Sequence, residues 1–253
     1  MSWRVPACVT DARNALAFLS RLVPPASAAE DSPFAPLSRA VPYYPMAGLV
    51  LGGIACIPLL LPLPIFITAW LYALILAWTT RGLHWDGLAD LADACGSNAT
   101  GDRFWEILKD SRIGAFGVMA LVFGIGGQVA AVAAVAACLE KGAWLPLLLA
   151  PVYGRGMVIL FGRLVKPNER STLAALIQPG ITSFAAFTSL VIVFALTALC
   201  LDTLPFLACL SLTGVILYVL RRIALAHDGA NGDFHGTVIV TSEIAVLVSA
   251  VLG

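Results

Sequence analysis

Apolar residues fill most of this 253-residue chain in long blocks, which short polar segments separate. Each block approaches the roughly 20 residues that a helix needs to cross a bilayer. Backbone groups inside a bilayer must be hydrogen-bonded within the protein, so we expect the blocks to form one helical bundle. The expected spans are 44–62, 64–80, 115–139, 143–161, 184–201, 203–220 and 237–252. The pattern predicts an all-α, polytopic membrane protein with six or seven spans and short amphipathic cytoplasmic helices.

The first long apolar block is divided into two helices by Pro58, Pro62 and Pro64, because an interior proline removes a backbone hydrogen bond. Before it, the amphipathic stretch TDARNALAFLSRL is expected on the membrane surface. A polar, proline-rich loop follows at 24–36. No repeat or domain boundary is visible, so we expect residues 1–253 to form one membrane-embedded domain.

Composition supports a membrane protein, since 60% of the residues are hydrophobic and only 12% are charged. The mean hydropathy is +0.92, and soluble domains carry about 25% charged residues. The formal net charge is zero, which gives no indication of a nucleic-acid partner. The six cysteines include no C-x-x-C pair and are interpreted as small apolar residues rather than as disulfides or a zinc site.

Basic residues orient the bundle. With a cytoplasmic N-terminus and seven crossings, Lys141 falls outside, Arg155 falls within a span, and thirteen of the fifteen Lys and Arg residues are cytoplasmic. The cytoplasmic set is Arg4, Arg13, Arg21, Arg39, Arg81, Arg103, Lys109, Arg112, Arg163, Lys166, Arg170, Arg221 and Arg222. This asymmetry follows the positive-inside rule. It places the loop after the second span and the loop before the last span in the cytoplasm.

The first of these loops contains HWDGLADLADACG, residues 84–96. Asp86, Asp90 and Asp93 have i, i+4, i+7 spacing, which places them on one face of a short amphipathic helix. Asp86 is expected at the N-cap, with His84 just before the helix. No Lys or Arg lies within 82–102, although like charges at i, i+4 destabilise a helix. A solvated face is one interpretation; a bound divalent cation such as Mg²⁺, which takes carboxylate and phosphate oxygens, is the other.

A second polar cluster is KDSRIGAFG, residues 109–117. Lys109, Ser111 and Arg112 lie just before a span that opens with Gly114 and Gly117. Cations and a hydroxyl beside a helix N-terminus are typical of a phosphate site. The alternative is that the two cations only flank the membrane.

A third cluster, DGANGDFHGTVIVTSE at 228–243, places Asp233 before the last span and Glu243 inside it. An acid inside the membrane is costly and indicates either a function or a structural hydrogen bond to another span. Arg155, inside the fourth span, must face protein: either it forms a buried ion pair, with Glu243 or an Asp, or its guanidinium binds phosphate. His84, His227 and His235 are interpreted as hydrogen-bond partners in preference to Mg²⁺ ligands.

These stretches occur together, in order, in a known family. GLHWDGLADLADACGS, KDSRIGAFG and GANGDFHG, preceded by FLSRLVP at 18–24, resemble the cobalamin synthase family, the adenosylcobinamide-GDP ribazoletransferases. The resemblance extends over the whole chain. The last motif departs from the family pattern, because Asn231 stands where Thr is usual and Val240 stands where a Glu is usual.

The resemblance implies a Mg²⁺-dependent transferase in a bacterial inner membrane, with its active site facing the cytoplasm. Adenosylcobinamide-GDP and α-ribazole, or α-ribazole 5′-phosphate, would give adenosylcobalamin, or its 5′-phosphate, and GMP. A ribose hydroxyl would attack the cobinamide-linked phosphorus. Other cobamide-assembly proteins are candidate partners. The implied metal ligands are Asp86, Asp90, Asp93 and Asp233; the catalytic set is these four and His84; the substrate-binding set is Lys109, Ser111, Arg112, Arg155 and Asn231.

Two other classes of membrane protein share part of this pattern. A CDP-alcohol phosphotransferase also uses an aspartate helix in a membrane bundle, but its pattern needs an early Arg and G-x-x-x-D-x-x-x-D spacing, whereas this chain has D-x-x-x-D-x-x-D. A metal or ion transporter could use Glu243 and Arg155 inside the membrane. Transporters, however, place their acids near the midplane, often within inverted repeats, and here the acids gather in loops.

Overall fold

The computed structural model describes residues 6–24, 35–138 and 144–253, and within these ranges it contains helices and no strand. The predicted loop at 24–36 lies almost entirely outside them, as do Arg4 and Lys141. The helices are α1 (Ala7–Leu19), α2 (Ala35–Ala40), α3 (Tyr44–Ala55), α4 (Ile65–Thr79), α5 (Leu83–Gly96), α6 (Asp102–Leu108), α7 (Ala115–Ala136), α8 (Leu145–Leu164), α9 (Thr172–Ile177), α10 (Ser183–Cys200), α11 (Thr203–Ala226) and α12 (Gly232–Ala250), with 3-10 turns η1 (Val41–Tyr43), η2 (Ile57–Leu60) and η4 (Gln178–Gly180). The all-α prediction is confirmed.

Six segments in the described part of the chain are long and apolar enough to cross a membrane. They are Leu37–Leu60, α7, α8, α10, α11 and α12. A seventh is possible if α4 and α5 count as one span bent by 88°. The bend lies at Arg81 and Gly82, whose φ angles of 60° and 69° are left-handed and therefore end a helix. Because α5 carries three aspartates, we assign α4 to the membrane and place α5 outside the spanning segments.

The predicted proline break is present where the sequence places it. Helix α3 ends at Ala55, η2 follows, and α4 begins directly after Pro64. Proline cannot donate a backbone hydrogen bond, so the chain reverses here between two helices instead of continuing as one.

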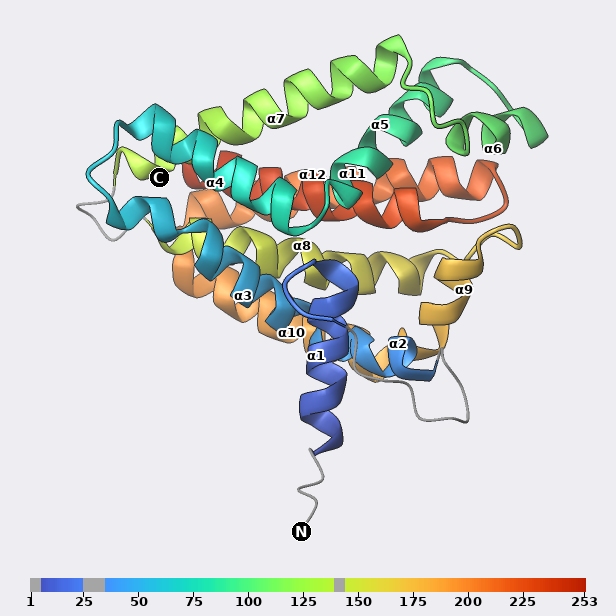
Figure 1. Ribbon diagram of the computed structural model, residues 1–253, viewed down its shortest axis with the longest axis horizontal. Coiled ribbons are helices and arrows are strands. Elements are labelled where there is room, and N and C mark those ends of the chain that lie inside the picture. The colour runs from blue at the N-terminus through green and yellow to red at the C-terminus, as the bar shows by residue number, and fades with distance from the viewer. Residues whose placement is uncertain (1–5, 25–34, 139–143) are drawn as a thin grey trace.

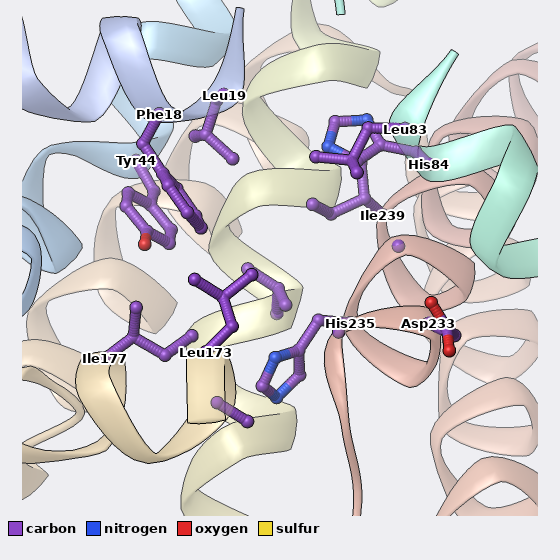
Figure 2. A pocket seen from close by; sticks show the side chains of 14 residues that line it. Phe18, Leu19, Tyr44, Leu83, His84, Leu173, Ile177, Asp233, His235 and Ile239 are labelled. Atoms are coloured by element: carbon purple, nitrogen blue, oxygen red, sulfur yellow. The ribbon is translucent and has the colours of Figure 1, made fainter. Parts of the chain in front are cut away.

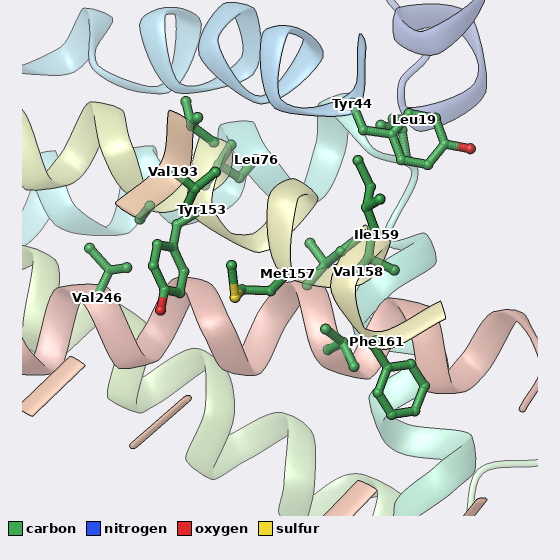
Figure 3. Packing of buried hydrophobic residues seen from close by; sticks show 14 of the residues in the cluster. Leu19, Tyr44, Leu76, Tyr153, Met157, Val158, Ile159, Phe161, Val193 and Val246 are labelled. Atoms are coloured by element: carbon green, nitrogen blue, oxygen red, sulfur yellow. The ribbon is translucent and has the colours of Figure 1, made fainter. Parts of the chain in front are cut away.

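Helix α8 runs through the middle of the bundle, between α12 on one side and α3 and α10 on the other (Figure 1). Figure 3 shows its Tyr153, Met157 and Phe161 among the buried side chains of the core. Pro151 lies inside α8 and lacks the N–H that would bond the Leu147 carbonyl. The Tyr72 hydroxyl of α4 donates to that carbonyl at 2.6 Å. A proline inside a buried helix is thus compensated by a neighbouring side chain.

Small residues let α3 and α8 approach closely. Gly48 and Gly52 form a G-x-x-x-G pair on α3, and a Cβ at Gly52 would lie 2.7 Å from the Leu148 carbonyl oxygen. A Cβ at Gly48 would overlap the Pro151 carbonyl. Such pairs are typical of helix contacts in membranes, where close van der Waals packing drives association.

Gly48→Ala is expected to destabilise the protein by about 2 kcal/mol, because the added methyl group forces α3 away from α8. Gly53→Ala is the matched control: it lies on the same helix, and a Cβ there meets nothing within 4 Å. Thermal unfolding in detergent measures both variants. Equal melting temperatures for the two variants would contradict the close α3–α8 contact.

Helix α1 packs against α2 and α3 and buries Asp11, Asn14 and Leu19. The expectation that this stretch lies on the membrane surface is therefore incomplete, because its buried face contacts protein. The segment after α1 is hydrogen-bonded to the α4–α5 bend. Arg81 donates to the Ser20 carbonyl at 2.7 Å, and the Arg21 N–H donates to the Thr79 carbonyl at 2.8 Å. The FLSRL stretch is thus held beside the start of α5.

The last span begins at Gly232, five residues before the predicted position of 237. The side-chain oxygen of Asn231 accepts hydrogen bonds from the N–H groups of Asp233 and Phe234 and so caps the helix. An Asn at this position stabilises a helix start by satisfying otherwise unpaired N–H groups. Asp233 and His235 consequently lie in the first turn of α12, not in a preceding loop.

Candidate active site

The first and third sequence motifs meet where α5 crosses the N-terminal end of α12. Gly87 lies against the backbone of Asp233, so that a Cβ at Gly87 would be only 2.8 Å from the Asp233 Cα. The Thr237 hydroxyl donates to the Gly87 carbonyl at 3.2 Å. A Cβ at Gly236 would be 3.1 Å from the Cα of His84. Glycines on both helices therefore bring the acid helix onto the start of α12.

The acid helix forms as predicted, but its start differs. Helix α5 begins at Leu83 with Gly82 as its N-cap, so Asp86 lies in the first turn and is not the cap. His84 lies inside the helix and is buried. The reason is the left-handed turn at residues 81–82, which starts the new helix earlier than an Asp86 cap would.

Negative charge accumulates around Asp90. Burial, and then the charges of Asp86, Asp233 and Asp93, raise the pKa of Asp90 to about 7. Asp86 is exposed, whereas Asp90, Asp93 and Asp233 are half-buried. None of the ion pairs among the described residues involves these four carboxylates. Asp233 thus lies near enough to α5 for its charge to act on Asp90, and its place in a metal site stays a prediction.

Asp93 has a partner that the sequence did not indicate. One of its carboxylate oxygens accepts from the Gly114 N–H at 2.7 Å, and the other accepts from the Gly117 N–H at 2.8 Å. These are N–H groups at the start of α7, where a helix favours an anion. The predicted phosphate site at this N-terminus is therefore filled by a carboxylate of the protein itself.

The remaining residues of the second motif lie on an exposed loop between α6 and α7. Lys109, Ser111 and Arg112 are all exposed. Arg112 pairs with Asp110 at 2.7 Å, and hydrogen bonds from Arg112 lower the pKa of Asp110 to about 2. The Arg112 side chain is 87% exposed, and exposed pairs of this kind contribute little to stability. The guanidinium is therefore free to exchange Asp110 for a phosphate.

Arg155 and Glu243 form an ion pair deep in the bundle, between α8 and α12. The Arg155 side chain is 1% exposed, and its guanidinium also donates to the Pro151 carbonyl at 3.2 Å. Gly154 permits the close approach, since a Cβ there would lie 2.6 Å from the Ile239 carbonyl oxygen. This geometry agrees with the ion-pair interpretation of both residues and leaves Arg155 no exposed face for phosphate.

The three histidines take different positions. His84 and His235 are buried, and within the described residues the Nε2 atom of His84 has no hydrogen-bond partner. His227 stacks on Phe104, with ring centroids 3.6 Å apart, and so ties the end of α11 to α6. Among the described residues, none of the three lies in a cluster of metal-ligand side chains.

The acid cluster fits Mg²⁺ in charge and donor type. Asp86, Asp90 and Asp233 offer carboxylate oxygens, the hard ligands that Mg²⁺ takes, and they lack basic partners. Asp93 fits less well, because both of its oxygens already accept backbone hydrogen bonds. Within the described part of the chain no three acidic, His or Cys side chains stand at metal-binding separation. Substrate oxygens would therefore have to complete the coordination.

Comparison with known proteins gives one consistent result. Residues 11–251 match the family described as cobalamin-5-phosphate synthase. The adenosylcobinamide-GDP ribazoletransferase of Nitratidesulfovibrio vulgaris (strain DP4) is 44% identical over 255 residues, which cover 98% of this chain and 100% of that protein. The proteins of the same name from Brevibacillus brevis (strain 47) and Azorhizobium caulinodans are 35% and 34% identical; they cover 83% and 96% of this chain, and this chain covers 86% and 96% of them. No solved structure matches the chain significantly.

Proposed function

Because this chain belongs to the cobalamin-5-phosphate synthase family, we propose that it transfers the cobinamide phosphate of adenosylcobinamide-GDP to a ribazole-type acceptor and releases GMP. The bond formed joins a ribose oxygen of the acceptor to the cobinamide-linked phosphorus. The bond broken joins that phosphorus to the oxygen of the departing GMP. The acceptor is α-ribazole or its 5′-phosphate, and the product is adenosylcobalamin or its 5′-phosphate.

The observation that supports this proposal most directly is the uncompensated cluster of carboxylates on α5 and α12. Phosphoryl transfer depends mainly on positioning the substrates and neutralising charge. Asp86, Asp90 and Asp233 would hold Mg²⁺, which when bound neutralises the pyrophosphate and the leaving oxygen. Without metal, the clustered carboxylates repel one another. Mg²⁺ that binds together with the substrate would supply the missing positive charge.

Other residues of the chain position the two substrates. Arg112, with Lys109 and Ser111 beside it, would bind phosphate oxygens after Arg112 releases Asp110. Asn231 caps α12 and donates to the Asp233 carboxylate at 2.6 Å, so its role is to orient Asp233. Asp233 either completes the metal site or, in its place, takes the proton of the attacking hydroxyl; the buried His84 is the second candidate for that proton.

GMP release by purified protein in detergent tests the function. We expect release only when adenosylcobinamide-GDP, α-ribazole and Mg²⁺ are all present, because the acceptor hydroxyl is the nucleophile. Release of GMP at the same rate without α-ribazole would indicate hydrolysis, and no release with all three present would reject the proposal. Uptake of Mg²⁺ by vesicles without GMP release would support the transporter alternative.

We also propose that the acid cluster faces the cytoplasm of a bacterial inner membrane, because the basic residues follow the positive-inside rule in that orientation. Cys8 on α1 and Cys138 beyond α7 are both exposed. In single-cysteine variants, a membrane-impermeant thiol reagent added to intact spheroplasts should label Cys138 and should label Cys8 only after lysis. The reverse pattern would invert the orientation.

A further inference from the structure

A pocket of about 130 Å³ lies beside the acid cluster, and the roles assigned above use only Asp233 and His84 of its lining. Figure 2 shows Phe18, Tyr44 and Ile177 on one side of it and His84 and Asp233 on the other. Its walls come from α1, α3, α5, α8, α9 and α12. Helices that are far apart in the sequence thus enclose one space next to Asp233.

The size and the walls of the pocket define what it can hold. A cavity on the order of 150 Å³ admits one benzene-sized ring, so a pocket of about 130 Å³ takes at most one ring of an aromatic base and excludes a corrin ring. Most of its lining is apolar, and Phe18 and Tyr44 stack with ring centroids 6.0 Å apart. Against such walls the polar edge of a guanine would lose its hydrogen bonds, which is costly. A ring edge that carries no polar atoms loses none.

A buried polar atom on the lining is left for a ligand. The Nε2 atom of His84, a residue only 4% exposed, has no hydrogen-bond partner within the described residues. The Tyr44 hydroxyl is also unpaired there, but it points away from His84 and Asp233 in Figure 2. Buried polar groups are normally paired, and a ring nitrogen or a sugar hydroxyl in the pocket would pair with His84.

We infer that this pocket binds one ring of the aromatic base of the ribazole-type acceptor, an inference that rests on the proposed function. Asp233 borders both the pocket and the acid cluster. A nucleoside with its base in the pocket therefore directs its ribose toward Asp233 and the pyrophosphate. Phe18, Tyr44 and Leu173 become specificity-determining residues for the acceptor, and the FLSRL stretch gains a role, since it carries Phe18 and Leu19 to the pocket.

Steady-state kinetics of pocket variants test this inference. Ala174 of α9 is buried and lines the pocket, whereas its neighbour Ala175 is exposed and does not. Ala174→Leu should raise the KM for α-ribazole about tenfold or more, as expected when a fitted apolar pocket is filled, and should leave the KM for adenosylcobinamide-GDP unchanged. Ala175→Leu, the matched control, should leave both constants unchanged. Leu173→Ala, at a position 40% exposed on the rim, serves as a second variant and should also raise only the α-ribazole KM.

The outcomes distinguish a failure of the pocket inference from a failure of the proposed function. An unchanged α-ribazole KM in Ala174→Leu and Leu173→Ala overturns the inference, as does a rise confined to adenosylcobinamide-GDP. A parent protein that releases no GMP rejects the proposed function instead. In that case thermal stabilisation by α-ribazole alone still tests the pocket, because a ligand that binds the folded state raises its melting temperature. The parent and Ala175→Leu should then be stabilised and Ala174→Leu should not.

Discussion

Asp90→Asn is expected to reduce turnover by at least about 100-fold. Removing a group that only orients a metal ligand already lowers activity by up to about 100-fold, and Asp90 is itself a proposed ligand. The same change should raise the melting temperature measured without Mg²⁺. Asp90 is half-buried beside three other carboxylates, and the amide keeps its shape while removing the repulsion. Mg²⁺ should stabilise the parent protein by binding its folded state, and this stabilisation should be lost in the variant.

Asp93→Asn on the same helix provides the comparison, because its effect on stability has the opposite sign. A carboxylate accepts from both Gly114 and Gly117, whereas an amide has one acceptor oxygen and leaves an N–H unpaired. The cost is about 1–3 kcal/mol, so the melting temperature should fall. If both variants were destabilised equally, Asp90 would also be a structural residue and the charge-repulsion account would be wrong.

Removing one partner of the Arg155–Glu243 ion pair should have the largest effect on stability. Arg155→Met leaves the Glu243 carboxylate buried without a counter-charge, at a cost of about 3–5 kcal/mol. Glu243→Leu should be similarly destabilising. The double variant should recover most of the loss, because two apolar side chains of similar volume can replace a buried pair. Unfolding of all four proteins in detergent measures this cycle.

The turnover of the double variant also decides the role of Arg155. If Arg155 only pairs with Glu243, a stable double variant should release GMP at close to the parent rate. A double variant that is stable but inactive would instead assign Arg155 to phosphate binding. Melting temperatures that fall further in the double variant than in either single variant would contradict the ion-pair account.

Local patterns were sufficient for much of the fold. The prolines at 58, 62 and 64 end a helix by removing hydrogen bonds, which requires no knowledge of neighbours, and the break is where the sequence indicates. The i, i+4, i+7 spacing of the three aspartates likewise defines one face of α5. The charge of Glu243 inside an apolar block requires a buried partner, and Arg155, within another apolar block, is a candidate that the sequence itself offers.

Other features depend on contacts between distant segments. Asp93 caps α7 only because α5 turns back toward Gly114, and no spacing in the sequence encodes that turn. The early start of α12 follows from the Asn231 cap, which the apolar pattern alone does not reveal. The pocket joins Phe18 to residues of α9 and α12. The FLSRL stretch belongs to the family pattern, but only the fold shows that it borders a pocket.

A Mg²⁺ titration of GMP release tests the central claim, that Asp233 on α12 and the acids of α5 form one metal–pyrophosphate site. Asp233→Ala should raise the Mg²⁺ concentration needed for half-maximal release and lower the maximal rate, because a carboxylate is removed from the cluster. Asp202→Ala is the matched control: Asp202 is exposed near the C-terminal end of α12, away from the cluster. The account predicts a shifted midpoint for Asp233→Ala and a parental midpoint for Asp202→Ala. A parental midpoint and full rate for Asp233→Ala would contradict it.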